Sequence, residues 1–141
     1  SIMSTNTNKR IAVKHIRDGA KAAYDKQKEC FICGSEENLE LHHVTSLTLL
    51  LENWAKTNNI DISTDAAVLA IRDRFIDEHR TELYDEVFTL CLKHHQKLHS
   101  IFGKAPLLHT SSKQVNWVSK QKAKALGLVT DSAKGSFSAF Y

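Results

Sequence analysis

Two pairs of soft metal ligands stand out in this sequence because they share one spacing. Two residues separate Cys30 from Cys33, two separate Cys91 from His94, and 57 residues lie between the pairs. Three thiolates and one imidazole form a closed, four-ligand zinc composition. We therefore expect a structural zinc ion that ties two distant segments together. The alternative is a redox Cys-x-x-Cys with a separately buried Cys91. Such a motif should open a helix in a βαβ pattern, which the sequence does not show.

Histidines provide a second set of reactive groups, since the chain has eight of them. His42 and His43 are adjacent in a short alternating stretch that predicts a strand. His95 and His99 are four residues apart, which on a helix places both imidazoles on one face and lets them grip one ion. His94 and His95 point about 100° apart around such a helix, so each can serve a different site. Alternatively, His95 and His99 are solvated surface residues.

The elements that must position these residues follow from periodicity and from capping signals. Apolar residues at helical spacing predict helices, alternation predicts strands, and glycine, asparagine or proline marks the breaks. We predict helices over residues 8–27, 47–56, 65–79, 93–102 and 111–126, and strands over 39–44 and 86–90. Residues 30–35 predict a tight turn, in which Gly34 can supply a positive φ angle. Residues 128–141 look irregular.

Charge is distributed unevenly along the chain, although the net charge is only +3. Residues 39–90 carry ten acidic and four basic side chains, whereas residues 91–141 carry eight basic and one acidic. A basic C-terminal third indicates a polyanionic partner, with nucleic acid as the first choice. The alternative is an ordinary solvated surface.

Length and composition limit the class of protein. The 141 residues fit one domain, and 42% hydrophobic and 25% charged residues are close to the globular average. The densest apolar run, residues 47–51, is far too short to span a bilayer, so we expect no membrane partner. Three cysteines cannot form an even disulfide framework, which favours reduced thiols and a cytoplasmic location.

Together these motifs resemble the HNH endonucleases, the ββα-metal nuclease family. The resemblance is carried by Cys30-x-x-Cys33, Leu41-His42-His43-Val44 and Leu90-Cys91-x-x-His94-His95-x-x-x-His99. It is closest to the zinc-knuckle HNH proteins of bacteriophages, many of which are free-standing homing endonucleases. It implies an α+β, mostly helical single domain, 1–141, with a ββα-metal core over 30–103. Around the core we expect a basic N-terminal helix over 4–28, a helical insertion over 46–85, and a basic C-terminal helix and tail over 104–141.

The family implies a role for each histidine of the motif. His43 matches the general base that activates water. His42, His95 and His99 match ligands of one catalytic divalent cation, which could be Mg²⁺, Mn²⁺, Ni²⁺ or Zn²⁺. An all-imidazole ligand set suits zinc, nickel or cobalt better than magnesium, which prefers oxygen. His94 replaces a cysteine common in the family's zinc pair, and this exchange preserves zinc binding.

Two features of the motif need a structural answer. The family's middle asparagine, which orients the base, is replaced by Glu86, and either Glu86 or Asp85 could accept a hydrogen bond from His43. Furthermore, neighbours on a flat strand point to opposite faces. His42 and His43 can therefore serve one site only if the strand ends or bulges there.

The predicted last helix offers a surface for DNA. Lys113, Trp117, Lys120 and Lys124 follow one helical face at steps of four, three and four. Lysines along a phosphate backbone give salt-sensitive, largely sequence-independent affinity. Trp117 could stack on a base or a sugar, although a tryptophan among lysines is more often packed on the domain. A neighbouring face with Val115 and Val118 is expected to pack on the core.

The sequence therefore predicts a metal-dependent endonuclease that hydrolyses phosphodiester bonds of double-stranded DNA, as phage homing endonucleases do. It would work in the bacterial host cytoplasm if it is phage-encoded, and a homodimer would allow it to cut both strands. The alternative is a zinc-knuckle DNA-binding module that has lost catalysis. Both hypotheses need the two zinc pairs, but only the enzyme needs His43.

Overall fold

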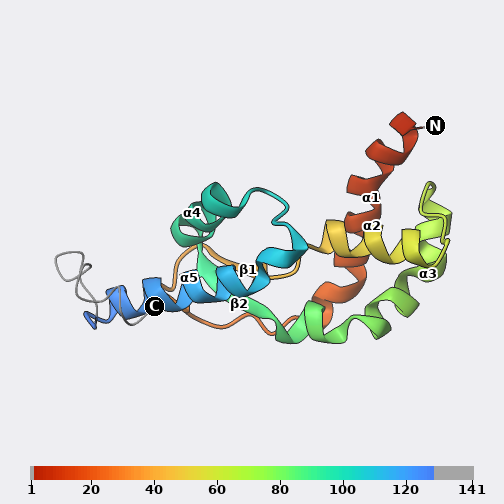
Figure 1. Ribbon diagram of the computed structural model, residues 1–141. Coiled ribbons are helices and arrows are strands. Elements are labelled where there is room, and N and C mark those ends of the chain that lie inside the picture. Colours follow the sequence, from red (N-terminus) through yellow and green to blue (C-terminus); the bar gives the residue numbers. More distant parts are fainter. Residues whose placement is uncertain (1, 129–141) are drawn as a thin grey trace.

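The computed structural model describes residues 2–128, with side chains described from residue 11 onward. The tail that we expected to be irregular lies beyond these residues, apart from Leu128. Five α-helices, two strands and three short helical turns are described, and Figure 1 shows their arrangement. The α-helices are α1 (Ile2–Ala20), α2 (Leu47–Thr57), α3 (Asp65–Glu78), α4 (Leu92–Phe102) and α5 (Ser111–Ala125). The strands are β1 (Leu39–His43) and β2 (Val87–Cys91), and the turns are η1 (Lys21–Ala23), η2 (Thr81–Asp85) and η3 (Leu108–Thr110).

A two-stranded antiparallel sheet links the two chemical motifs of the chain. Leu39 pairs with Cys91 and His43 pairs with Val87, so the strands align along their full lengths. Helix α4 begins at the residue after β2, and its first turns therefore lie beside the sheet. The protein thus has the mixed α+β, mostly helical class that the sequence predicts.

The three helices α1, α2 and α3 enclose the larger of two buried apolar clusters, on the right in Figure 1. Both α2 and α3 begin with a side-chain cap, in which the hydroxyl of Ser46 or Thr64 accepts a backbone N–H. Helices α2 and α3, which belong to the predicted helical insertion, pack on the N-terminal helix α1. The fully buried side chains of this cluster include Ile16, Leu51, Val68, Phe75 and Leu83.

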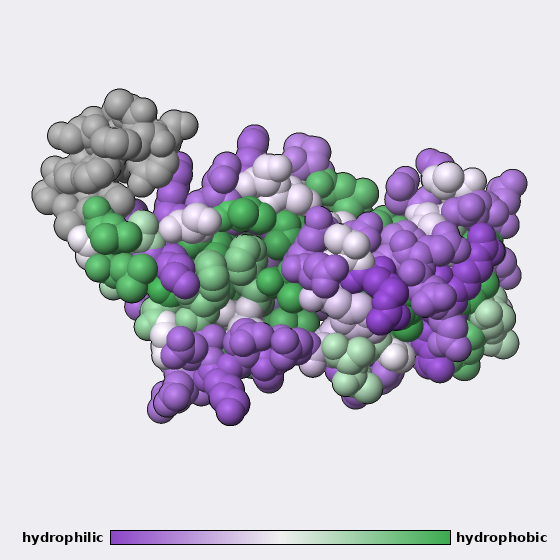
Figure 2. Space-filling view, turned by 90° about the horizontal axis from the view of Figure 1, so that it is seen from below, coloured by the Kyte–Doolittle hydropathy of each residue, from purple (hydrophilic) through white to green (hydrophobic). Residues whose placement is uncertain are grey.

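A second buried cluster joins the sheet to α4, α5 and the cysteine turn. It contains Ile32, Leu90, Leu98 and Val118, and Trp117 packs against it while half-buried. Viewed from below, apolar surface gathers over this half of the molecule, whereas the half with α1–α3 is mostly hydrophilic (Figure 2). Within residues 2–128, no helix combines the length and apolarity that a bilayer crossing requires.

The N-terminal helix is shorter at its C-terminal end than the sequence predicts. α1 ends at Ala20 and a 3₁₀ turn follows to Ala23, whereas helical periodicity continues to residue 27. Tertiary contacts explain the difference. The ring of Tyr24 packs against that of His43, with 5.1 Å between the ring centroids. The backbone N–H of Gln27 donates to Thr89 Oγ1 at 2.8 Å. These contacts draw the chain off the helix axis and lead it along the sheet to Cys30.

Candidate active site and metal centres

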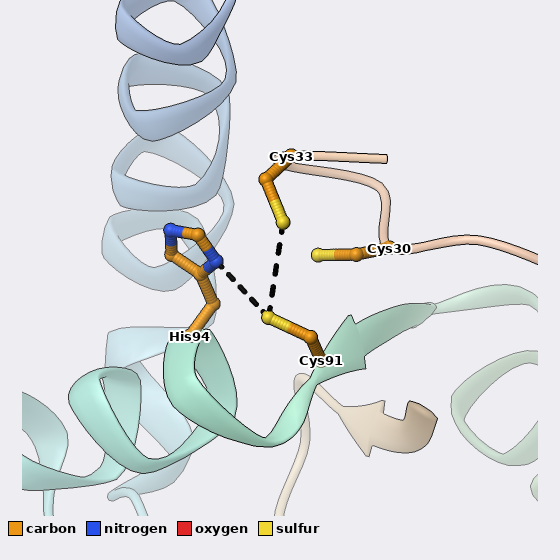
Figure 3. A group of neighbouring side chains, drawn as sticks. All are labelled: Cys30, Cys33, Cys91 and His94. Carbon is orange, nitrogen blue, oxygen red and sulfur yellow. Dashed lines mark hydrogen bonds between the residues drawn. The ribbon is translucent and has the colours of Figure 1, made fainter. Parts of the chain in front are cut away.

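The two cysteine–histidine pairs meet in one cluster at the end of the sheet. A tight turn holds the first pair, in which the N–H of Gly34 donates to the carbonyl of Cys30 at 2.9 Å and Gly34 has a φ of 76°. Cys91 ends β2, and His94 lies in the first turn of α4. The four ligand atoms all lie within 4.8 Å of one another. Figure 3 shows the side chains of Cys30, Cys33, Cys91 and His94 converging on a common point.

The chemistry of this cluster favours a bound cation. Burial alone would raise the pKa of the Cys30 thiol, but hydrogen bonds from backbone N–H groups outweigh it and lower that pKa. Burial and the neighbouring sulfurs raise the pKa of Cys33. All three cysteines are free, and the sulfurs of Cys33 and Cys91 lie 3.8 Å apart, well beyond a disulfide bond length. The cluster could therefore hold a metal ion, which would neutralise the mutual repulsion of its thiolates.

The described fold does not support a redox role for Cys30 and Cys33. The pair lies in a turn between η1 and β1, and the two strands of the described chain are antiparallel. A redox Cys-x-x-Cys would instead be expected near a βαβ unit.

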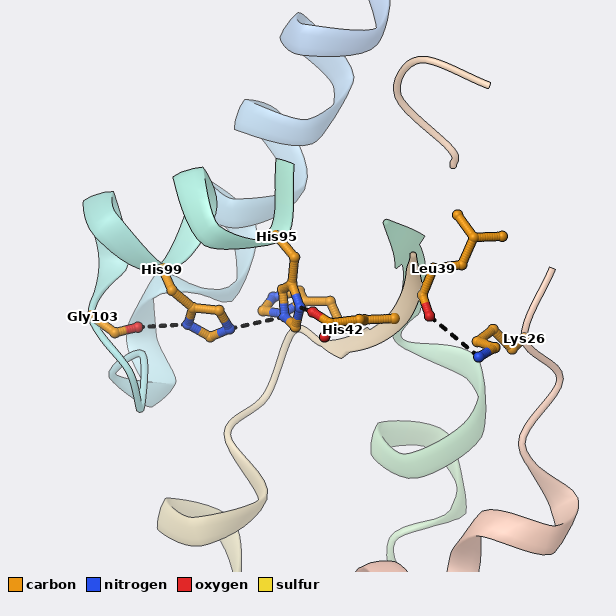
Figure 4. A network of polar contacts seen from close by, with 7 residues as sticks. Lys26, Leu39, His42, His95, His99 and Gly103 are labelled. Atoms are coloured by element: carbon orange, nitrogen blue, oxygen red, sulfur yellow. Dashed lines mark hydrogen bonds and ion pairs between the residues drawn. The ribbon is translucent and has the colours of Figure 1, made fainter. Parts of the chain in front are cut away.

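Three histidines form a second cluster between β1 and α4. His42 Nδ1 lies 3.2 Å from His95 Nε2, and His95 Nε2 lies 3.0 Å from His99 Nε2. His95 and His99 are one turn apart on α4, as their spacing predicts, and His42 faces them from β1 (Figure 4). Their inward nitrogens lie within 4.8 Å of one another, close enough to share one metal ion.

The outward nitrogen of each imidazole faces an oxygen acceptor, and this fixes where the protons are. A carbonyl, amide or carboxylate oxygen can only accept, so each outward nitrogen carries the hydrogen. These pairs are His95 Nδ1 with Glu40 Oε1 at 2.7 Å, His99 Nδ1 with Gly103 O at 2.7 Å, and His42 Nε2 with Gln114 Oε1 at 2.7 Å. In neutral rings, three lone pairs then point at one another. This arrangement fits a divalent cation, because a metal-binding histidine usually donates its other ring N–H to an oxygen acceptor of this kind.

His42 is suited to the role of a neutral ligand. Its side chain is 2% exposed, and burial lowers its pKa to about 4, against the opposing hydrogen bond to Gln114. A metal ligand must be unprotonated to bind, so this low pKa keeps the lone pair available at neutral pH.

His43 lies at the end of β1 and has different partners. Its Nε2 lies 3.0 Å from the main-chain oxygen of Leu83, which belongs to the π-helical turn η2. A carbonyl only accepts, so Nε2 carries the hydrogen and Nδ1 keeps its lone pair in the neutral ring. Burial holds the pKa of His43 down to about 4, with the nearby Arg17 charge acting in the same direction. His43 is thus neutral at pH 7 and is able to accept a proton through Nδ1.

The structure does not place Glu86 or Asp85 against His43, contrary to what the motif suggests. The side chains of both acidic residues are exposed, and the main-chain oxygen of Glu86 accepts from the N–H of Val44 at 3.1 Å. Glu86 therefore extends the pairing of the two strands, and Leu83 provides the acceptor that orients the imidazole. The physical reason is that η2 brings a carbonyl into reach where the family motif uses a side chain.

One cleft of about 410 Å³ is lined by both histidines of the strand pair. His43 is the last residue of β1, which satisfies the requirement that the strand end there for both side chains to reach one site. His95 and His99 line the same cleft, and Arg17 from α1 and Lys104 after α4 add cationic side chains. The cleft therefore combines the neutral imidazole of His43, three convergent imidazoles and two cationic side chains against the one carboxylate of Glu40, a lining that suits a phosphate diester.

The last helix matches its predicted boundaries, and Val118 packs on the core as predicted, but Val115 does not. Lys113, Lys120 and Lys124 are exposed, as a DNA-binding face requires, whereas Trp117 is half-buried against the second apolar cluster. Val115 is 39% exposed, although the sequence suggested that it packs inward. Gln114 and Val118 are the fully buried residues of α5. The packed face is therefore rotated relative to the prediction.

Several residues of the site escaped the sequence reasoning, among them Glu40, Leu83 and Gln114. Glu40 could have been found, because it precedes His42 by two positions and alternation places both on one face of β1. Leu83 acts through its main-chain oxygen, which has no sequence signature. Gln114 lies 72 residues from His42 along the chain, so only the fold connects them.

Comparisons with known proteins identify a family for the chain but no structural relative. No solved structure matches the chain. Residues 2–135 match the family model of the phage T5 nicking endonucleases. Because this match covers nearly the whole sequence, the chain belongs to the nicking endonuclease family.

Proposed function

We propose that this protein is a metal-dependent endonuclease that nicks double-stranded DNA by an HNH-type mechanism with His43 as the general base. Family membership supports an endonuclease acting on DNA. The observation that carries the mechanism is the cleft that His43 shares with His42, His95 and His99. A nick requires one active site, so a single chain suffices for the reaction. Homing activity and a homodimer stay predictions of the sequence resemblance.

His43 takes a proton from water in this mechanism. The Leu83 carbonyl holds the Nε2–H, so the lone pair on Nδ1 is the atom that accepts the proton. The resulting hydroxide attacks phosphorus, the bond to the 3′ oxygen breaks, and this oxygen takes a proton from solvent, which leaves 5′-phosphate and 3′-hydroxyl ends. In the free protein the base is neutral but weak, since its pKa is about 4. A phosphate in the cleft would raise that pKa, because a nearby negative charge stabilises imidazolium, whereas the catalytic cation would lower it.

His42, His95 and His99 would hold the catalytic cation through their inward nitrogens. A divalent cation there supplies stabilisation for the negative charge that develops on the leaving 3′ oxygen. Arg17 and Lys104 line the same cleft, and in this proposal they would bind the scissile or a neighbouring phosphate. Imidazole ligands favour zinc or nickel over magnesium or manganese, unless the DNA adds oxygen ligands.

The cysteine cluster has a structural role in this proposal. Cys30, Cys33, Cys91 and His94 would bind a zinc ion that fixes the end of β2 and the start of α4. His95 follows His94 directly, so the zinc ion would set the position of a catalytic ligand. The exposed lysines of α5, namely Lys113, Lys120 and Lys124, would bind the DNA backbone outside the cleft.

The experiment that tests the proposal follows the conversion of supercoiled plasmid to relaxed circles. Zinc-loaded protein freed of other cations is assayed with Mg²⁺, Mn²⁺, Ni²⁺ or Zn²⁺, and His95→Ala is compared under the same conditions. We expect relaxed circles with at least one cation and none with EDTA, and loss of activity in the variant. Intact DNA binding without cleavage in any cation would contradict the proposal and support the non-catalytic DNA-binding module.

A further inference from the structure

Gln114 is a fully buried polar side chain that no part of the proposed reaction uses. It lies in the first turn of α5 with 0% of its surface exposed. Its Oε1 lies 2.7 Å from His42 Nε2, and its amide nitrogen donates to Val44 O at 3.0 Å and to Thr110 Oγ1 at 3.1 Å. A buried amide left without partners destabilises the folded protein, so this set of hydrogen bonds holds the side chain in one orientation.

The direction of these hydrogen bonds can be deduced. The carbonyl of Val44 only accepts, so the Gln114 amide group that faces it must be the NH₂. Its oxygen therefore faces His42, and an oxygen there requires the hydrogen of His42 to be on Nε2. The lone pair of His42 is consequently on Nδ1, the nitrogen that faces His95. Gln114 thus selects the one tautomer of His42 that can bind an ion together with α4.

The same contacts dock α5 on the sheet. Gln114 and Val118 are one turn apart and are the fully buried residues of this helix. Val118 packs in the second apolar cluster, whereas Gln114 bonds to a ligand histidine and to the residue that follows β1. The helix that carries the exposed lysines is therefore connected to the three-histidine cluster by a short, defined network.

We propose that Gln114 is a positioning residue of the three-histidine site, and that cation binding there and the docking of α5 stabilise each other. The inference rests on the proposed function only in that the three imidazoles bind a cation. Because such coupling is reciprocal, the free energy by which a docked α5 tightens cation binding equals that by which the cation stabilises the docked helix.

The test compares Gln114→Met, which keeps the length of the side chain without its polar atoms, with Gln121→Met on the same helix. Zinc-loaded full-length protein is titrated with Ni²⁺ by calorimetry, without DNA. We expect Gln114→Met to bind Ni²⁺ about tenfold more weakly, as loss of an outer hydrogen-bond partner usually does. We also expect it to lose the NMR signal of the His42 Nε2–H, while Gln121→Met stays like wild type. Equal Ni²⁺ affinities of Gln114→Met and wild type would overturn the inference.

A second measurement needs no variant of Gln114. Hydrogen exchange of the α5 amides is followed in wild type with and without Ni²⁺, and in His95→Ala as the control. We expect Ni²⁺ to slow exchange in wild type but not in the control. An α5 that exchanges equally fast with and without bound Ni²⁺ would contradict the coupling. Wild type that takes up no Ni²⁺ would instead contradict the proposed cation site itself, so the two failures are distinguishable.

Discussion

The imidazole of His43 is held by the main chain of Leu83, whose carbonyl oxygen lies 3.0 Å from Nε2. This carbonyl is presented by the π-helical turn η2, and such turns are frequent at functional sites. A main-chain acceptor cannot be removed by a side-chain substitution. The orientation of His43 therefore depends on the shape of η2 and not on the acidic residues that follow it.

Substitution of Glu86 tests this relationship. Its side chain is exposed and its contribution to the sheet is a main-chain hydrogen bond, which Glu86→Ala retains. We expect this variant to keep the wild-type rate of plasmid nicking within about twofold, which corresponds to a change of about 0.5 kcal/mol in the activation free energy. Single-turnover kinetics would check this. A rate as low as that of a variant without His43 would show that the carboxylate orients the base after all.

The protonation of His43 gives a prediction for pH. Burial lowers its pKa to about 4 in the folded protein, whereas an unfolded histidine titrates near pH 6.5. His43 should therefore remain neutral down to about pH 5. Because the unfolded chain takes up the proton first, stability should fall as pH decreases from about 6.5 towards 4. Nitrogen-15 NMR of the imidazoles measures the pKa and the tautomer of His43 in the folded protein, and the urea-unfolded chain is the control. A folded-state pKa near 6.5, or a hydrogen on Nδ1, would contradict the structure.

The sequence predicted most of the site because its patterns are local. The spacing of Cys30, Cys33, Cys91 and His94 defines two ligand pairs, and helical geometry places His95 and His99 on one face. The sequence could not predict contacts between residues that lie far apart along the chain and meet only in the folded protein. The early end of α1 depends on packing of Tyr24 against His43, and the inward face of α5 depends on the hydrogen bond from His42 to Gln114. Neither contact has a periodic or spacing signature.

Arg17 should contribute to DNA affinity through charge. It lines the cleft, whereas Lys14 lies exposed on the same helix outside the cleft lining. We expect Arg17→Ala to bind DNA more weakly and to reduce the slope of log affinity against log salt by about 1, the value for one lost phosphate contact. Lys14→Ala is the matched control. Salt titrations by fluorescence anisotropy measure both slopes, and equal slopes for Arg17→Ala and wild type would exclude a phosphate contact.

Loss of a cysteine-cluster ligand should affect folding before catalysis. With zinc a thousandfold above its Kd, an ion bound only by the folded state stabilises it by about 4 kcal/mol. We therefore expect Cys91→Ala to lose zinc and to unfold at a clearly lower temperature than wild type. Ser35→Ala, in the same turn as Cys30, is the control, because Ser35 bonds to Cys30 through its main-chain oxygen. A Cys91→Ala protein that retains one equivalent of zinc and wild-type thermal stability would rule out this site.

The most direct test of the account is the single-turnover nicking rate of His43→Ala on supercoiled plasmid, at a cation concentration that saturates wild type. His43 is the proposed base and not a cation ligand, so the variant should bind Ni²⁺ and DNA as wild type does. Removal of a general base typically reduces the rate by about 10²- to 10⁴-fold, and we predict a loss within this range. Nicking by His43→Ala at the wild-type rate would contradict the assignment of the base and with it the proposed mechanism.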